Sequence, residues 1–358
     1  MTEKPLVSYV VGVRNMGDTI GNTIESLLNQ NYPNKEIIVI NDGSTDNTDE
    51  ILSQYPIKFI KTKKKGISNA RNLGYKQSKG DFIAFTDADC ELDPEWTNKI
   101  IEGFTDDNIG IIGGITKFRK DESFVSKYRS IEFSKRFKNI KKRDVVWAGG
   151  PGSMFRRDIL DKIGGFNPEW RYGEDAEISF YVIEHGYKIL KINDAITYHM
   201  PENKFWRLVR KGFRDAKAYT RVLRSHIKTS FHNKFNSTWY FPYDAYLLPI
   251  LYAFLIVSFF LLPIFYFIDF FVFIPFFSEF FVEILWYIWF WLFILISIFL
   301  FIYGLIPSYQ VAAKSKNKRI YAFLGTILLH NFRGVAWGFG LLVGLRNLLH
   351  KKSNGPIV

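Results

Sequence analysis

Residues 82–89 read FIAFTDAD, an apolar run that ends in two aspartates, Asp87 and Asp89. We expect Phe82–Phe85 to form a buried strand, because short apolar runs bounded by polar turn formers are typical of the inner strands of a parallel sheet. Two carboxylates at the exit of such a strand can hold a hard divalent cation between them. The D-x-D spacing alone is weak evidence for a metal site, since the same acids could cap a helix before Pro94.

Upstream of this stretch, the chain alternates between short apolar strands and amphipathic helices. We expect strands at Leu6–Val13, Glu36–Ile40 and Ile57–Ile60, and helices at Thr19–Gln30, 46–54 and Ser68–Gln77. This alternation predicts an α/β fold with a mostly parallel sheet and helices on both of its faces. Ligands of such sheets bind beyond the carboxyl ends of the strands, so the polar residues there are candidates for a binding site. These residues are Arg14, Asn15, Asn41–Ser44 and Thr86–Asp89.

The composition separates two kinds of environment along the chain. The 358 residues exceed one average domain. The total of 35 phenylalanines is high, and most of the excess falls after Phe241. A single cysteine, Cys90, excludes an internal disulfide framework, and we expect it to be a small buried side chain rather than a nucleophile. The net charge of +12 comes without zinc-finger spacing or an RNA-recognition motif, so we expect no nucleic-acid partner and favour a membrane surface.

Two long uncharged stretches, residues 245–268 and 284–306, are each able to cross a bilayer. Acids lie between them, whereas lysines and arginines lie before the first and after the second. The positive-inside rule therefore predicts a multi-pass protein of the cell membrane with its N-terminal domain on the cytosolic side. A third apolar stretch, residues 320–345, is interrupted by His330, Asn331 and Arg333. It is expected to be either a re-entrant or interfacial helix pair or a third span.

The segment that precedes the first span is strongly basic. From Lys204 to Lys234 the chain contains ten lysines or arginines and one acid, Asp215, and aromatic residues are interleaved with the basic ones. This pattern predicts an amphipathic helix in the membrane interface, where anionic lipid contributes about 1 kcal/mol per basic residue. We therefore expect an α/β domain at 1–202, basic interface helices at 203–240 and an α-helical membrane domain at 241–358. A second basic stretch, Phe118–Arg143, is either a solvated face or a surface near lipid headgroups or a phosphorylated acceptor.

Several other residues have both a structural and a functional interpretation. Asp42 could form a simple turn or accept hydrogen bonds from a nucleoside. Arg71 opens a helix after Gly66, where it could be a surface residue or a phosphate contact. Glu174 and Asp175 lie at the start of another helix, where they could cap the helix or act as a general base. His199 follows an apolar stretch. It could be a structural histidine, a third metal ligand or a diphosphate contact.

The order of these motifs is more specific than any one of them. They occur in sequence at Val7–Asn15, Asn41–Asp46, Gly66–Asn72, Asp87–Asp89, Gly149–Ser153 and Gly173–Asp175. Together, over residues 6–215, they resemble the family 2 glycosyltransferases of the GT-A fold, a Rossmann-like nucleotide-sugar domain. The resemblance implies an inverting transfer from a nucleotide-sugar donor with Mg²⁺ or Mn²⁺.

The resemblance also implies roles for individual residues. Asp42 matches the nucleoside contact, Asp87 the acid near the ribose, Asp89 the metal-binding acid and Asp175, paired with Glu174, the catalytic base. His199 and Asp87 are expected to join Asp89 at the metal, and Gly150–Ser153 matches a loop near the acceptor. The remaining donor-binding candidates are Gly12, Arg14, Asn15, Arg71, Ala88, Arg207 and Arg210.

The chain departs from the family pattern at two places. Gly12-Val13-Arg14-Asn15 stands where Pro-x-Tyr-Asn is usual, so the Arg14 guanidinium would replace a stacking tyrosine. The Gln-x-x-Arg-Trp motif of processive polysaccharide synthases does not occur in the sequence. We therefore expect transfer of one sugar from a UDP- or GDP-sugar to a membrane lipid acceptor, either a polyprenyl phosphate or a lipid-linked glycan. The alternatives are a processive polysaccharide synthase and a non-catalytic membrane scaffold that binds nucleotides.

Overall fold

The computed structural model describes residues 4–119, 123–137, 145–148, 151–226, 243–271, 279–315 and 319–350. The chain forms two compact units. The first comprises Met1–Arg119, Ser134–Pro201 and Val222–Tyr240, and the second Lys120–Phe133, Glu202–Arg221 and Phe241–Val358.

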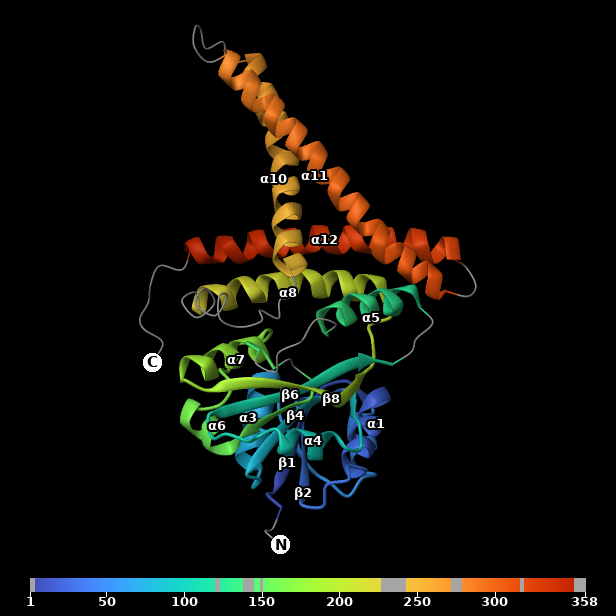
Figure 1. Cartoon of the computed structure of the whole chain (residues 1–358), viewed down its shortest axis with the longest axis vertical. Helices are drawn as coiled ribbons and strands as arrows, with labels where there is room; N and C mark the ends of the chain where they lie inside the picture. Colours follow the sequence, from blue (N-terminus) through green and yellow to red (C-terminus); the bar gives the residue numbers. More distant parts are fainter. Residues whose placement is uncertain are drawn as a thin grey trace. The chain divides into compact units, whose positions relative to one another are not determined.

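The first unit is built on an eight-stranded sheet in the order β3-β2-β1-β4-β7-β6-β8-β5 (Figure 1). Its strands are β1 Val7–Val13, β2 Lys35–Asn41, β3 Lys58–Lys61, β4 Phe82–Asp87, β5 Cys90–Leu92, β6 Ile109–Phe118, β7 Ser153–Arg156 and β8 Lys188–His199. β1 pairs in parallel with β2 and β4, and β2 with β3. β7 runs antiparallel between β4 and β6, and β5 is antiparallel to β8. The predicted α/β fold with a mostly parallel sheet is confirmed.

Helices cover both faces of this sheet. They are α1 Gly17–Leu28, α2 Thr48–Leu52, α3 Ile67–Gln77, α4 Trp96–Glu102, α6 Arg157–Ile163 and α7 Glu174–Glu184. β1 shows why both faces are apolar: Tyr9 and Val11 pack with α1 and α4 on one side, whereas Val10 packs on the other side against α3. Burying one such side chain stabilises the fold by roughly 1.5–3 kcal/mol.

The two aspartates of the D-x-D motif lie at the junction of two strands. Strand β4 continues to Asp87, and Asp89 is followed directly by β5, whereas helix α4 begins only at Trp96. The two aspartates therefore do not cap a helix. They flank a tight turn between two strands of the same sheet.

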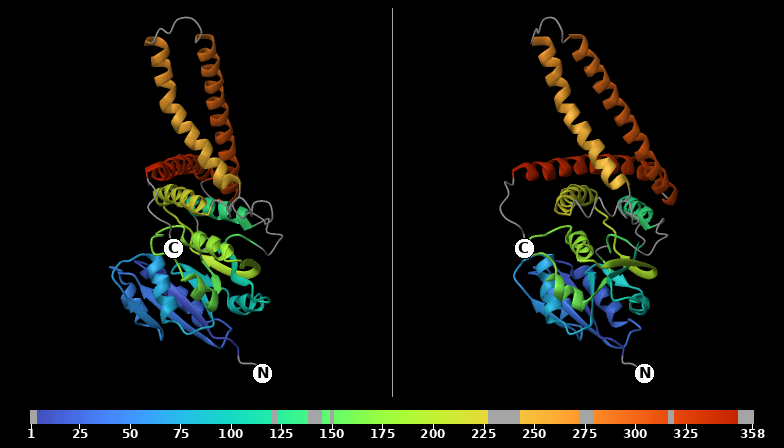
Figure 2. Two further views of the ribbon diagram at one scale, coloured as in Figure 1. Left: turned by 90° about the vertical axis from the view of Figure 1, so that its left-hand side faces the viewer. Right: turned by 60° about the vertical axis from the view of Figure 1, so that its left-hand side comes forward.

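The second unit contains long helices. It includes α10 Tyr243–Phe271, α11 Glu279–Lys314, α12 Arg319–His350 and most of α5 Phe124–Phe137 and α8 Phe205–Ser225. α10 and α11 extend side by side, and α12 runs across their base (Figures 1 and 2). Glycines of α12 allow this close packing, because a Cβ at Gly338 would lie 2.8 Å from the backbone nitrogen of Ala253 on α10.

The third apolar stretch is a single continuous helix, so the expected helix pair is wrong. Its polar residues have partners on other helices: His330 bonds Tyr128 of α5 at 3.0 Å, and Arg333 pairs with Glu132 of α5. Asn331 accepts from the hydroxyl of Tyr252 on α10 at 3.2 Å and donates to the backbone oxygen of Ile327 in its own helix at 2.9 Å. Because each of these side chains has a partner on another helix, they do not interrupt α12.

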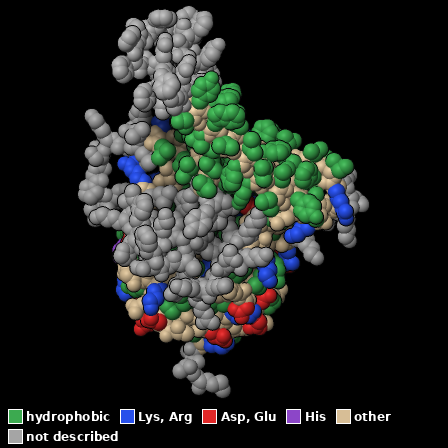
Figure 3. Space-filling model, turned by 45° about the horizontal axis from the view of Figure 1, so that its top comes forward, with side chains coloured by type: hydrophobic (Ala, Val, Ile, Leu, Met, Phe, Trp, Pro, Cys, Tyr) green, Lys and Arg blue, Asp and Glu red, His purple; other side chains and the backbone are tan. Residues whose placement is uncertain are grey.

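Two of the described helices, over Tyr287–Lys314 and Arg319–Arg346, are long and apolar enough to cross a membrane by length and composition. Their outward faces carry large apolar side chains, and such side chains form the broad apolar surface in Figure 3. Only 11% of the first window is buried within the protein, against 39% of the second, so α12 has the larger share of protein contacts.

Gly80→Ala is expected to lower the free energy of unfolding by about 1–3 kcal/mol, because the added methyl group overpacks a site that cannot move. A Cβ at Gly80 would lie 2.7 Å from the backbone nitrogen of Ser8 and 2.8 Å from the backbone oxygen of Leu6. Denaturant unfolding measures the change. The control is Gly21→Ala on α1, whose methyl group would meet side chains alone. Equal stability of the two variants would contradict the backbone clash.

Candidate active site

A cluster of two carboxylates, a thiol and an imidazole lies where β4 ends. It comprises Asp87, Asp89, Cys90 and His199, whose ligand atoms all lie within 4.8 Å of one another. The sheet builds the cluster: β5 folds back from the Asp87–Asp89 turn and pairs with β8, so that Cys90 stands opposite His199. His199, which is 110 positions beyond Asp89 in the chain, thereby lies beside the D-x-D turn.

The imidazole of His199 is oriented for metal binding. Its Nδ1 lies 2.6 Å from the backbone oxygen of Met200, which can only accept, so Nδ1 carries the proton. Nε2 is then an acceptor, and it lies 3.8 Å from Oδ1 of Asp89. A hydrogen bond that fixes the free nitrogen is the usual support of a metal-bound histidine. Two carboxylates and this imidazole fit Mn²⁺ or Mg²⁺, and Cys90 is fully buried beside them, as expected for a packing residue.

Arg71 connects this cluster to the second acidic motif. Its guanidinium is 4% exposed and forms two ion pairs, at 3.0 Å to Asp87 and 2.8 Å to Glu174. It also lies 5.3 Å from the centre of the Phe166 ring. The interpretation of Arg71 as a surface residue is wrong, because α3 turns it into the protein, where a buried charge requires partners.

The Glu174–Asp175 pair opens α7 beside Arg71. Burial raises the pKa of Glu174 to about 7, against the opposing charge of Arg71. Burial likewise raises the pKa of Asp175, and Arg71 again opposes the shift. The Asp175 carboxylate accepts from the backbone N–H of Ala176 at 2.9 Å and from the indole N–H of Trp147 at 3.2 Å. A carboxylate with a raised pKa is suited to accept a proton near neutral pH.

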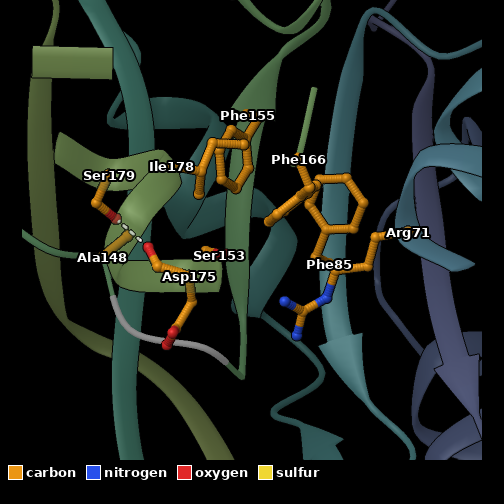
Figure 4. Close-up of a pocket in the computed structure, with 9 residues that line it drawn as sticks. All are labelled: Arg71, Phe85, Ala148, Ser153, Phe155, Phe166, Asp175, Ile178 and Ser179. Carbon is orange, nitrogen blue, oxygen red and sulfur yellow. Dashed lines mark hydrogen bonds between the residues drawn. The ribbon is translucent and has the colours of Figure 1, made fainter. Parts of the chain in front are cut away.

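A small cavity separates Arg71 from Asp175. The two side chains lie on opposite sides of it, and the rings of Phe155 and Phe166 also line it (Figure 4). Ser153, at the start of β7, also lines the cavity. Of the expected acceptor loop, Gly149 and Gly150 lie outside the described residues, while Gly152 adopts a φ of +74°.

The expected nucleoside contacts lie at the exits of β1 and β2. Asp42 is buried and accepts the backbone N–H groups of Lys65 and Gly66 at 2.7 and 2.8 Å, so it shapes the loop before α3. Asn15 has a φ of 52° and accepts the N–H of Thr45 at 2.7 Å, which ties the two strand exits together. Arg14 is exposed beside this loop.

Gly12 has a structural role, because a Cβ there would lie 2.7 Å from Cδ1 of Ile67 on α3. Ala88 is held by Thr19, whose hydroxyl donates to its carbonyl at 2.9 Å. Arg207 and Arg210 are exposed on α8 in the second unit. Their proposed contact with the diphosphate stays a prediction.

The sequence interpretation missed two residues near Asp175. Trp147 is 7% exposed and donates to the carboxylate, and Lys191 is 2% exposed on β8. The sequence does hold a signal for Lys191: it lies two residues after Ile189, so strand alternation places it on the same inward face of β8. The tryptophan precedes a glycine-rich loop, and no sequence pattern links it to Asp175.

The model of glycosyl transferase family 2 matches residues 8–164, from β1 to the end of α6. This part of the chain belongs to glycosyl transferase family 2. The matched region holds Asp42, Arg71 and both aspartates of the D-x-D turn, whereas Asp175 and His199 lie beyond it. The family is one of transferases, so residues 8–164 form part of a glycosyltransferase domain.

Two curated proteins are similar in sequence to this chain. Glycosyltransferase AglE of Haloferax volcanii is 27% identical over 228 residues, which cover 61% of this chain and 74% of that protein. A poly-beta-1,6-N-acetyl-D-glucosamine synthase of Staphylococcus aureus is 30% identical over 196 residues. That match covers 51% of this chain and 47% of the synthase, so the chain spans about half the length of this relative.

Among solved structures, the mannosyltransferase PcManGT of Pyrobaculum calidifontis, in complex with GDP-Man and Mn²⁺, matches with a TM-score of 0.54 and 18% identity. The match covers 63% of this chain and 65% of that chain. At this identity the likeness concerns the fold, and it agrees with the GT-A fold expected from the motifs.

Asp89→Ala is expected to weaken Mn²⁺ binding by at least about tenfold to a hundredfold, the cost already known for losing a residue that supports a metal ligand. Electron paramagnetic resonance of free Mn²⁺ during a titration measures the affinity. Glu91→Ala is the control, because Glu91 neighbours Cys90 but pairs with Arg119. An unchanged affinity in Asp89→Ala would remove Asp89 from the metal site.

Proposed function

We propose that this protein transfers one sugar, with inversion, from a UDP- or GDP-sugar to a lipid acceptor at the membrane surface. The observation that carries the proposal is the double ion pair of Arg71, which holds the D-x-D turn and the Glu174–Asp175 pair next to one another. A donor diphosphate at the turn would thereby present its sugar to the carboxylate that accepts the acceptor's proton.

The reaction follows from these positions. Asp175 takes the proton of an acceptor hydroxyl, whose oxygen forms a bond to the anomeric carbon while the bond from that carbon to the diphosphate breaks. Asp87, Asp89 and His199 would hold the divalent cation, which supplies positive charge to the leaving diphosphate. Asp42 and Asn15 shape the loops that would receive the nucleoside, and Arg14 could stack on its base.

Membrane placement is part of the same proposal. We propose that α10 and α11 span the bilayer and that α12 lies in the interface, which its course across their base supports. The basic segments before α10 and after α11 would then face the cytosol, together with the catalytic domain. α8 would lie against anionic lipid, where its exposed Arg207 and Arg210 could meet a lipid-borne phosphate.

Asp175→Asn is expected to lower turnover by about a hundredfold to ten-thousandfold, the usual contribution of a general base. Donor binding should persist, because the metal-binding residues remain. In the wild type, turnover should fall as the pH is lowered through the raised pKa of Asp175, since the protonated carboxyl cannot accept a proton. Asp194→Asn, at an exposed position of β8, is the control. Equal turnover of Asp175→Asn and wild type would exclude Asp175 as the base.

The donor and the product test the function itself. Nucleotide-sugars are screened for Mn²⁺-dependent thermal stabilisation, because a specific ligand stabilises the folded state by mass action. The stabilising donor is then offered with lipid acceptors in membranes. A product longer by one sugar supports the proposal, and a ladder of lengths would favour a processive polysaccharide synthase. A protein with no metal-linked nucleotide binding would be a scaffold.

A further inference from the structure

Lys191 occupies a position that an apolar residue would ordinarily fill. It lies on β8 and is 2% exposed. Ile189, two residues before it, packs in the cluster that includes Ala176 and Ile178 of α7, whereas Leu190 packs on the opposite face. Strand alternation therefore places Lys191 on the face of β8 that α7 covers. Asp175 stands at the start of that helix.

The segment that carries Trp147 lies against the same part of β8. The backbone N–H of Val145 donates to the carbonyl of Ile189 at 2.9 Å. Two pairs further along, Gly113 of β6 stands opposite Lys191, and a Cβ at Gly113 would collide with the carbonyl of Ala148. The segment thus passes directly over the Gly113–Lys191 pair. This course brings the indole of Trp147 to Oδ2 of Asp175, at 3.2 Å.

The charges in this region complement one another. Burial lowers the pKa of Lys191 to about 7, while the negative charge of Asp175 opposes the shift. By reciprocity, a protonated Lys191 favours the ionised form of Asp175. Arg71 acts in the same direction, but its guanidinium also pairs with Asp87 and Glu174. A buried lysine is costly, so its position beside a candidate base indicates a role in the site.

We propose that Trp147 and Lys191 are positioning residues for the Glu174–Asp175 pair. The indole N–H orients the Asp175 carboxylate, and the Lys191 ammonium keeps that carboxylate ionised until it accepts a proton. The inference rests on the proposed role of Asp175 as the base of the transfer.

The arrangement also selects the class of acceptor. A hydroxyl must lose a proton as it attacks, whereas a phosphate is already ionised and needs no base. A site that keeps a carboxylate charged with two dedicated side chains is therefore built for a hydroxyl. Among the two proposed acceptors, this is a sugar hydroxyl of a lipid-linked glycan rather than a polyprenyl phosphate.

Lys191→Met is the first test, because methionine fills a similar volume without the charge. Replacing a buried charge in this way should leave the protein folded. With a lipid-linked sugar as acceptor, the pH at which turnover falls on the acidic side should move upward. A shift of about one pH unit corresponds to a tenfold loss of turnover at pH values well below that fall. The matched control is Lys188→Met on the same strand, which removes an exposed lysine 3.6 Å from Asp106. A profile that superimposes on the wild type would overturn the role of Lys191.

Trp147→Phe removes the indole donor and keeps a ring in the core. Turnover should fall by about tenfold to a hundredfold, the range expected for a lost hydrogen bond to a charged group, while the KM of the donor stays within about twofold. Trp170→Phe, a buried tryptophan of the same apolar cluster, is the control. Equal losses in the two variants would reduce Trp147 to a packing residue.

A double-mutant cycle gives a readout that does not need transfer. The thermal stabilities of Lys191→Met, Asp175→Asn and the double variant are measured in detergent near pH 7. Non-additive changes are expected, because each single variant removes one of two charges that act on each other. Additive changes would overturn the pairing of Lys191 with Asp175. A coupled pair in a protein that transfers no sugar would instead contradict the proposed function alone.

Acceptor choice completes the test. Transfer to a lipid-linked glycan, sensitive to Lys191→Met and Asp175→Asn, supports the inference. Transfer to a polyprenyl phosphate at a rate that neither variant changes would overturn the assignment of a hydroxyl acceptor.

Discussion

The buried guanidinium of Arg71 is the interaction on which the site depends. It stands between Asp87, at the end of β4, and Glu174, at the start of α7, and its charge is tolerable in the interior because both carboxylates pair with it. The same pairs hold the D-x-D turn, a candidate metal site, next to the helix start that carries the candidate base. Without the arginine, burial of Glu174 and Asp175 would favour their protonated forms, and the base would lose its charged state.

The mixed sheet supplies the second constraint. In a wholly parallel sheet, β4 would be followed by a loop after Asp87. Here the chain turns at Ala88 and continues as β5, which pairs antiparallel with β8. This antiparallel pair brings His199 to the aspartates and leaves Cys90 buried behind them. The candidate ligands thus lie on strand ends and a tight turn, which would hold a metal geometry more closely than a long loop would.

The second unit depends on the same physical rule, that a buried charge is kept only with a partner. Arg129 of α5 pairs with Glu132 and with Glu202, which also accepts from Lys211 of α8. These charges hold the pKa of the Glu202 carboxyl well below its usual range. Arg333 joins the network from α12 through Glu132. Polar residues that seemed in the sequence to interrupt an apolar segment are therefore contacts between helices.

The local features of the chain could be predicted from its sequence: the alternating strands and helices, the acids at the strand exits and the long apolar segments. These follow from side-chain period and residue type over a few neighbouring positions. Tertiary structure alone decided which of the acids meet, because Arg71 and Glu174 are 103 positions apart and are joined only when α3 and α7 pack on one face of the sheet. The same holds for Trp147 and Lys191, whose proximity to Asp175 depends on strand register and burial, which no local pattern encodes.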